Sequence, residues 1–138
     1  MENLSRNKMR ELTISCLFAA NIKTNIGLDV SAKKTIDDIF AQENIEDIPL
    51  FCQEIFLAAL KNKEEIISQV SSYLRNWKFN RLNEVAQALF LEVIAEHSYS
   101  VYKTEKKVLI NFAVDYAKKY LESSDFRYIN AVLDKVLL

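Results

Sequence analysis

The side chains that most often perform catalysis are scarce in this chain of 138 residues. His97 is the only histidine, and Cys16 and Cys52 are the only cysteines, so a zinc site or a histidine-based proton relay lacks parts. Glu92 and Glu96 are four residues apart, and on a helix they would share one face as a paired-carboxylate site. Such pairs are more commonly solvated, and we expect both carboxylates to be exposed on the surface.

Glycine is also nearly absent, with a single residue in the whole chain. Phosphate-binding loops and dinucleotide-binding fingerprints each need several glycines, so both are excluded. Taken with the scarcity of histidine, this predicts a protein that is not an enzyme. We expect no catalytic residue, no metal site and no cofactor.

Binding chemistry remains, and the first turn of the first predicted helix carries Arg6, Lys8 and Arg10. Ser5 is suited to cap this helix, yet Lys8 stands where a capping box would have Glu or Gln. A helix N-terminus has partial positive charge and favours carboxylates by about 0.3–1 kcal/mol each. These cations are therefore either solvated or a site for a polyanion.

Aromatic residues next to cations suggest which polyanion this could be. Tyr73 lies close to Arg75, and Tyr128 follows Arg127 directly. Single-stranded RNA is held by base stacking on aromatic rings together with phosphate pairing. Most of the other aromatic residues fit core positions, including Trp77.

The composition indicates an all-α protein with a single domain over residues 1–138. Half of the residues are hydrophobic and 11% are aromatic, which is enough for a real core. One glycine and one proline are too few for a sheet with tight hairpins. No apolar run approaches the roughly 20 residues of a membrane span, and buried free thiols suit a reducing compartment. We expect a cytoplasmic protein.

The net charge of −1 is unevenly distributed along the chain. Residues 29–65 contain nine acidic and four basic side chains, whereas the segments before and after have a basic excess. Folding could collect these blocks into an acidic and a basic face, or it could mix them. The acidic segment either faces a partner or is solvated, and both remain open.

Hydrophobic periodicity predicts about seven helices joined by short connections. Their expected positions are residues 6–23, a helix capped by Ser31, residues 50–60, a helix that follows residues 61–65, residues 82–96, a helix that begins near residue 105, and a last helix capped within residues 123–125.

The end of the chain, VLINFAVDYAKKYLESSDFRYINAVLDKVL over residues 108–137, resembles the closing signature of the NusB family of transcription antitermination factors. The opening stretch resembles the family as well, with Arg10, Glu11, Leu17 and Phe18 in register. The positions that match the closing signature are Ile110, Asn111, Ala113, Val114, Ala117, Lys118, Asn130, Val132, Leu133, Asp134 and Lys135, with Tyr128 where the family has Phe.

The resemblance implies a compact bundle of two packed helical subdomains. It further implies binding to the boxA element of nascent ribosomal RNA together with the small-subunit ribosomal protein NusE. That complex acts with RNA polymerase and other antitermination factors. The RNA-binding residues that the resemblance and the basic and aromatic pattern indicate are Arg6, Lys8, Arg10, Phe18, Tyr73, Lys118, Arg127 and Tyr128.

Departures from the family pattern support an alternative. The N-terminal run of arginines is reduced to Arg6, Asn7 and Lys8, which weakens an electrostatic contact with RNA. The chain could thus be a protein–protein adaptor that keeps the partner surface without specific RNA binding. RNA methyltransferases carry the same fold as an appendage, but no methyl-donor site is present here. We expect Asn111 and Asn130 to be buried where the last helices meet.

Overall fold

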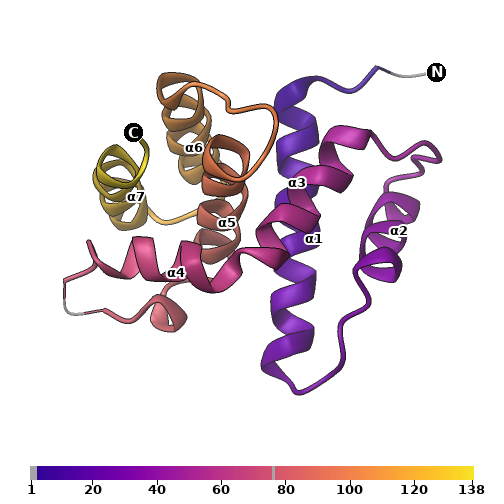
Figure 1. The fold of residues 1–138 in the computed structure, drawn as a ribbon, viewed down its shortest axis with the longest axis horizontal. Coiled ribbons are helices and arrows are strands. Elements are labelled where there is room, and N and C mark those ends of the chain that lie inside the picture. The colour runs from indigo at the N-terminus through magenta and orange to yellow at the C-terminus, as the bar shows by residue number, and fades with distance from the viewer. Residues whose placement is uncertain (1–2, 76) are drawn as a thin grey trace.

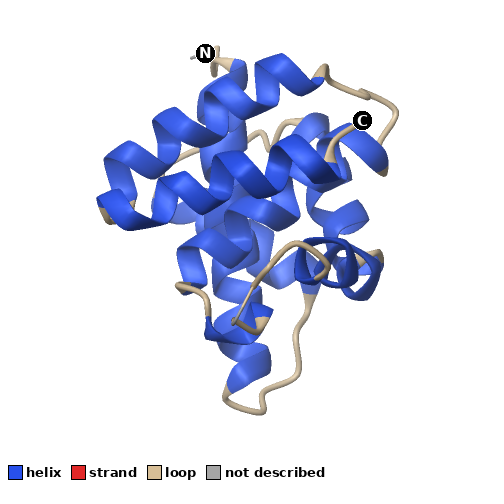
Figure 2. Cartoon of the chain, turned by 90° about the vertical axis from the view of Figure 1, so that its left-hand side faces the viewer, coloured by secondary structure: helices blue, strands red, loops and turns tan. Residues whose placement is uncertain are grey.

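The computed structural model describes residues 3–75 and 77–138, and within these ranges it contains helices and no strand (Figures 1 and 2). This confirms the all-α fold predicted from the sequence. In the described ranges a single 3₁₀ turn, η1 (Phe79–Arg81), and seven α-helices follow one another. The helices are α1 (Arg6–Asn25), α2 (Ala32–Gln42), α3 (Leu50–Lys61), α4 (Lys63–Ser71), α5 (Glu84–Ser98), α6 (Lys106–Tyr120) and α7 (Ser123–Val136).

Side-chain caps fix where several of these helices begin. Ser5 Oγ accepts a hydrogen bond from the Lys8 amide at 3.0 Å, as predicted, and Ser31 caps α2 in the same way. At α5 the cap is Asn83, so this helix begins two residues later than predicted. The predicted cap of α7 within residues 123–125 is wrong, because the helix already begins at Ser123 and no side chain caps it.

Helix α5 is the centre of the molecule. It packs against α1 and α3 on one side and against α4, α6 and α7 on the other. Figure 1 shows α1, α2 and α3 grouped on one side of α5, with α4, α6 and α7 grouped on the opposite side. Every residue from Ala86 to Glu96 is buried, because neighbouring helices surround this segment. The two packed subdomains thus share α5.

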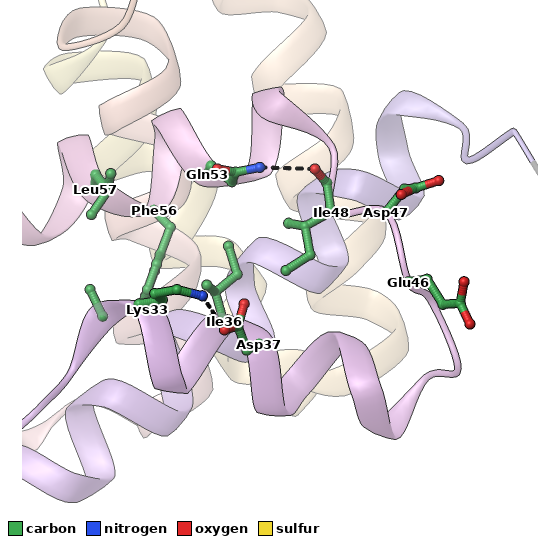
Figure 3. Close-up of a pocket in the computed structure, with 10 residues that line it drawn as sticks. Lys33, Ile36, Asp37, Glu46, Asp47, Ile48, Gln53, Phe56 and Leu57 are labelled. Carbon is green, nitrogen blue, oxygen red and sulfur yellow. Dashed lines mark hydrogen bonds and ion pairs between the residues drawn. The ribbon is translucent and has the colours of Figure 1, made fainter.

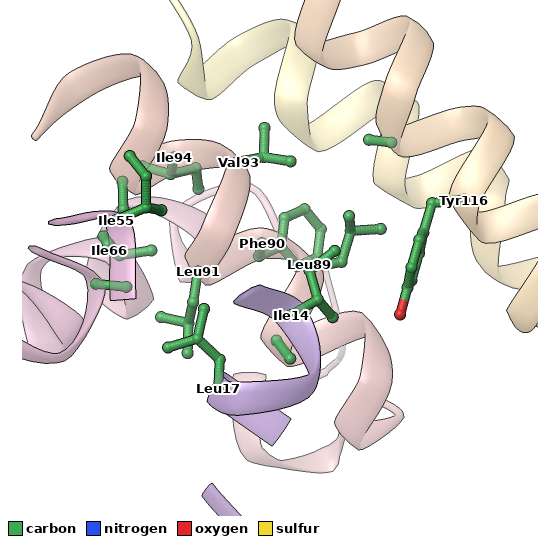
Figure 4. Packing of buried hydrophobic residues seen from close by; sticks show 14 of the residues in the cluster. Ile14, Leu17, Ile55, Ile66, Leu89, Phe90, Leu91, Val93, Ile94 and Tyr116 are labelled. Carbon is green, nitrogen blue, oxygen red and sulfur yellow. The ribbon is translucent and has the colours of Figure 1, made fainter. Parts of the chain in front are cut away.

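The hydrophobic core forms around α5 and is shown in Figure 4. Ile14 and Leu17 of α1 point toward Leu89 and Leu91 of α5, and all four are almost fully buried. A ring from α6, Tyr116, closes the core on the far side. Burial of apolar area on this scale is the main favourable contribution to folding.

Both cysteines lie in this core as free thiols, as predicted. Cys16 on α1 and Cys52 on α3 have no exposed surface. Burial raises the pKa of the Cys16 thiol to about 12 and that of the Cys52 thiol to about 11. Each is therefore a small apolar side chain in this protein.

Several polar and aromatic residues lie elsewhere than predicted. Asn111 and Asn130 are exposed, so the prediction that they are buried where the last helices meet is wrong. Trp77 and Tyr120 are exposed rather than in the core. No helix in the described part of the chain has the length and apolar character needed to cross a membrane.

Candidate nucleic-acid interface

Arg10 is buried between α1 and α5, where it forms an ion pair with Glu96. Its Nη2 lies 2.8 Å from Glu96 Oε2 and its Nε lies 2.9 Å from Oε1, a bidentate geometry. Arg10 is 4% exposed and Glu96 is fully buried. Asn7 and Thr104 complete the arrangement with further hydrogen bonds, to Arg10 and to Glu96 respectively. One of the three cations of the first turn is therefore held inside the fold.

Glu92 lies one helical turn before Glu96 and is also fully buried, so the expectation of two exposed carboxylates is wrong. Neither Glu92 oxygen has a hydrogen-bond partner in the described part of the chain. Burial raises the pKa of Glu92 well above its usual range, the neighbouring charge of Glu96 adds to this, and Arg10 opposes it. Burial therefore favours the protonated form of Glu92.

Glu96 remains ionised. Burial by itself would raise its pKa, but hydrogen bonds from Arg10 and Thr104 hold the pKa below the usual value. The two carboxyl groups thus form an internal acid–carboxylate pair closed off from solvent. This arrangement contributes to the fold and offers no open site for a substrate.

The two other cations of the first turn, Arg6 and Lys8, are exposed. The guanidinium carbon of Arg6 lies 4.1 Å from the centre of the Phe51 ring. Lys8 Nζ lies 3.8 Å from a carboxylate oxygen of Glu43, a loose pair exposed on both sides. The first turn therefore presents two solvent-accessible cations beside the free N–H groups of a helix start.

A second cluster lies between α4 and α7, where Tyr73 and Tyr128 line one pocket with Trp77, Arg75 and Arg81. Its volume of about 580 Å³ falls within the range of roughly 300–1,000 Å³ typical of small-ligand sites. Tyr73 and Trp77 expose 48% and 63% of their surface. Aromatic faces beside guanidinium groups can hold a stacked base and its phosphate.

Tyr128 forms the inner wall of this pocket. Its ring centre lies 6.3 Å from that of Phe90 in the core, which anchors it. Burial, followed by the nearby charge of Asp125, raises the pKa of Tyr128 to about 12. The phenol therefore stays neutral and can donate a hydrogen bond.

The remaining residues indicated by the sequence lie in other places. Phe18 is half-buried and lines a groove along α1 with Tyr116 and Tyr120. Lys118 and Arg127 are exposed, and Lys118 Nζ lies 5.9 Å from the Phe126 ring.

The structure thus separates the eight residues instead of gathering them into one patch. Figure 1 places the start of α1 and the outer end of α4 well apart. Trp77 and Arg81 belong to the second cluster and were not singled out from the sequence. The sequence feature that could have indicated them is the break between α4 and α5. No apolar stripe continues through this break, so a tryptophan there need not be buried.

The acidic segment forms a separate region between α2 and α3 (Figure 3). Asp37 pairs with Lys33 at 2.7 Å, and Asp38 pairs with Lys34 at 3.1 Å, which neutralises part of the charge. The side chains of Glu46 and Asp47 extend outward from the connection before α3. This region is one wall of the molecule and is distinct from the aromatic pocket between α4 and α7.

A sequence profile of the NusB family matches residues 7–138. The chain belongs to the NusB family. The resemblance of its first and last helices is thereby confirmed over almost the full length. Transcription antitermination protein NusB of Clostridium kluyveri is 31% identical, over 97% of this chain and 96% of that protein. The corresponding protein of Methylacidiphilum infernorum is 30% identical, over 97% of this chain and 91% of its own length.

Solved NusB structures share this fold. Thermotoga maritima NusB superimposes with a TM-score of 0.83 at 20% identity, over 98% of this chain and 92% of that one. A crystal structure of the antitermination factors NusB and NusE in complex with double-stranded RNA contains a chain with a TM-score of 0.81. That chain is 19% identical, with 95% of this chain and 94% of that one covered. At these identities the likeness establishes the arrangement of helices.

Proposed function

We propose that this NusB-family protein is a transcription antitermination factor that binds boxA-type RNA of nascent ribosomal RNA together with the ribosomal protein NusE. The complex would act in the cytoplasm with RNA polymerase and other antitermination factors. Support comes from membership in a family of antitermination proteins and from a solved NusB of the same fold that binds NusE and RNA. No catalytic step is part of this role.

The observation that carries the proposal is the aromatic and arginine pocket between α4 and α7. Its exposed rings suit base stacking, and Arg75 and Arg81 suit the flanking phosphates. The exposed cations Arg6 and Lys8 add a second phosphate contact. Arg10 is left out of the proposed surface, because an RNA contact would require its buried pair with Glu96 to open.

Phe18, Lys118 and Arg127 are further residues of the proposed surface and lie outside these two clusters. Phe18 lies in an apolar groove suited to a protein side chain, so its contact could be with NusE instead of RNA. Lys118 and Arg127 are exposed cations that can follow an RNA backbone. These roles are proposed, as is the role of the pocket in RNA binding.

The test is a fluorescence-anisotropy titration with a boxA RNA and a scrambled RNA of equal length. It is run at two salt concentrations, with and without NusE, and with each RNA also annealed to its complement. We expect tighter binding to single-stranded boxA, a further gain with NusE, and weaker binding at high salt. Equal affinity for both sequences with NusE present would overturn the boxA assignment.

The burial of Arg10 favours one alternative, a protein–protein adaptor without specific RNA binding. It leaves two exposed cations on the first turn of α1, which lowers the expected RNA affinity further. The adaptor predicts that NusE binds this chain with unchanged affinity whether or not boxA RNA is added. The same titration distinguishes the two functions.

A further inference from the structure

Two aromatic rings hold the guanidinium group of Arg6. Its central carbon lies 4.1 Å from the centre of the Phe51 ring and 5.3 Å from that of Tyr102. The two rings meet edge to face, with centres 4.8 Å apart and planes at 65°. Both distances are within the roughly 6 Å over which a cation interacts with an aromatic face.

The rings belong to parts of the chain that the fold brings to the start of α1. Phe51 is the second residue of α3 and is 4% exposed, and Tyr102 lies half-buried in the connection between α5 and α6. Arg6 itself is exposed. The two rings are thus fixed by the core, while the outer side of the guanidinium group faces solvent.

This contact leaves the hydrogen-bonding capacity of Arg6 intact. An aromatic ring attracts the guanidinium cation without offering it a conventional hydrogen-bond acceptor such as a carboxylate or carbonyl oxygen. In residues 3–75 and 77–138, no hydrogen bond or ion pair involves the Arg6 side chain. Its donors are available to a phosphate, which guanidinium binds in bidentate geometry.

Lys8, the other exposed cation of this turn, is held differently. Its only described partner is Glu43, at 3.8 Å across an exposed pair. Such a pair restrains a lysine side chain weakly. The structure therefore orients Arg6 through two ring contacts and holds Lys8 only through one exposed pair.

We infer that Phe51 and Tyr102 are positioning residues that hold Arg6 in place for a phosphate of bound RNA. This rests on the proposed function. Because folding already restricts the Arg6 side chain, RNA binding loses less conformational entropy than it would with a free arginine. The two rings act through Arg6 and do not touch the RNA themselves.

The experiment measures boxA RNA affinity and its salt dependence for Arg6→Ala, Tyr102→Leu and the double variant. Arg6→Ala should weaken binding on the order of tenfold, the usual effect of losing a charged hydrogen bond, and lower the salt slope. Tyr102→Leu keeps the cation, so it should weaken binding roughly two- to fivefold with the slope unchanged. The double variant should bind like Arg6→Ala, because Tyr102 acts only through Arg6.

Two controls separate positioning from stability. Tyr102→Phe keeps the ring and should bind RNA like the wild type. Tyr99→Leu removes a ring from the same connection whose hydroxyl bonds Gln69 and Glu65, and it should leave RNA affinity unchanged. Thermal unfolding of each variant confirms that the protein tested is folded.

Each outcome has a distinct meaning. The inference would be overturned if Tyr102→Leu bound RNA with wild-type affinity. It would also be overturned if the double variant bound RNA more weakly than Arg6→Ala by the full effect of Tyr102→Leu. In both cases the proposed function would still stand. Wild-type protein that binds neither RNA would overturn the proposed function, and the inference with it. Coupled losses with unchanged thermal stability would establish the positioning role.

Discussion

Two regions of this protein combine arginine with acidic or aromatic side chains, and they do so in opposite ways. Between α1 and α5, Arg10 is buried and its guanidinium is occupied by Glu96. Between α4 and α7, Arg75 and Arg81 line an open pocket beside exposed rings. The difference shows that the burial of an arginine, more than its place in a basic stretch, decides whether its guanidinium is held inside the fold or stays accessible to a ligand.

The largest expected effect is on the buried pair. Arg10→Met should lower the free energy of unfolding by about 3–5 kcal/mol, because it leaves the Glu96 charge buried without its partner. Urea unfolding followed by circular dichroism measures this. RNA affinity of the folded protein should change little. A small loss of stability with a large loss of RNA affinity would place Arg10 on the ligand surface and break the comparison.

The second expected effect concerns Glu92 and is a dependence of the free energy of unfolding on pH. The raised pKa of Glu92 means that the folded protein keeps a proton that the unfolded chain releases near pH 4.5. Stability from this group is therefore complete below that pH and is lost as pH rises toward the folded-state pKa.

Glu92→Gln should remove this decline and match the wild type at acidic pH. At alkaline pH the variant should be more stable, by about 1.4 kcal/mol for each unit between the folded and unfolded pKa. Urea unfolding at several pH values measures the slope. The exposed Glu64→Gln is the control and should leave the slope unchanged. An identical slope in Glu92→Gln would show that Glu92 is ionised when folded.

A substitution in the aromatic pocket should have the opposite effect to Arg10→Met, because it should weaken RNA binding and leave stability nearly unchanged. Tyr73→Ala should weaken RNA binding by about 1–3 kcal/mol, the usual contribution of a stacked base. Since Tyr73 is 48% exposed, stability should change by no more than about 0.5 kcal/mol. Tyr73→Phe keeps the stacking face and should bind like the wild type. Loss of stability without loss of RNA affinity would make the pocket a structural feature.

The smallest effect is expected at Lys8. Its exposed pair with Glu43 contributes about 0.2–1 kcal/mol at most, so Lys8→Ala should leave stability nearly unchanged. The salt slope of RNA binding should fall by about 0.7, one phosphate contact to a single strand. Anisotropy titrations across a salt series measure this. An unchanged slope would remove Lys8 from the proposed surface and leave Arg6 as the cation of this turn.

Local signals predicted most of the fold. Ser5 and Ser31 marked two helix starts, and apolar spacing located seven helices because each buries one stripe. Family resemblance then supplied the way in which these helices pack. The prediction that Asn111 and Asn130 are buried was wrong. A match to the family signature does not say which side of a helix faces solvent.

The polar interior could not be predicted in the same way. Arg10 and Glu96 are separated by 85 intervening residues, and a single sequence gives no sign that they meet. Glu92 and Glu96 looked like a solvated pair because a helix usually has an exposed face. The better signal was the run ALFLEVIAE, which is apolar on every side of its helix and so indicates complete burial.

The buried thiols of Cys16 and Cys52 give the protein two internal reporters of its own opening. A thiol with a pKa of about 11 or 12 has almost no thiolate at neutral pH, and neither sulfur can be reached from solvent. Alkylation must therefore wait for α1 and α3 to separate. The rate at which a reagent labels the native protein would measure how often this half of the molecule comes apart, and whether RNA or NusE slows that event.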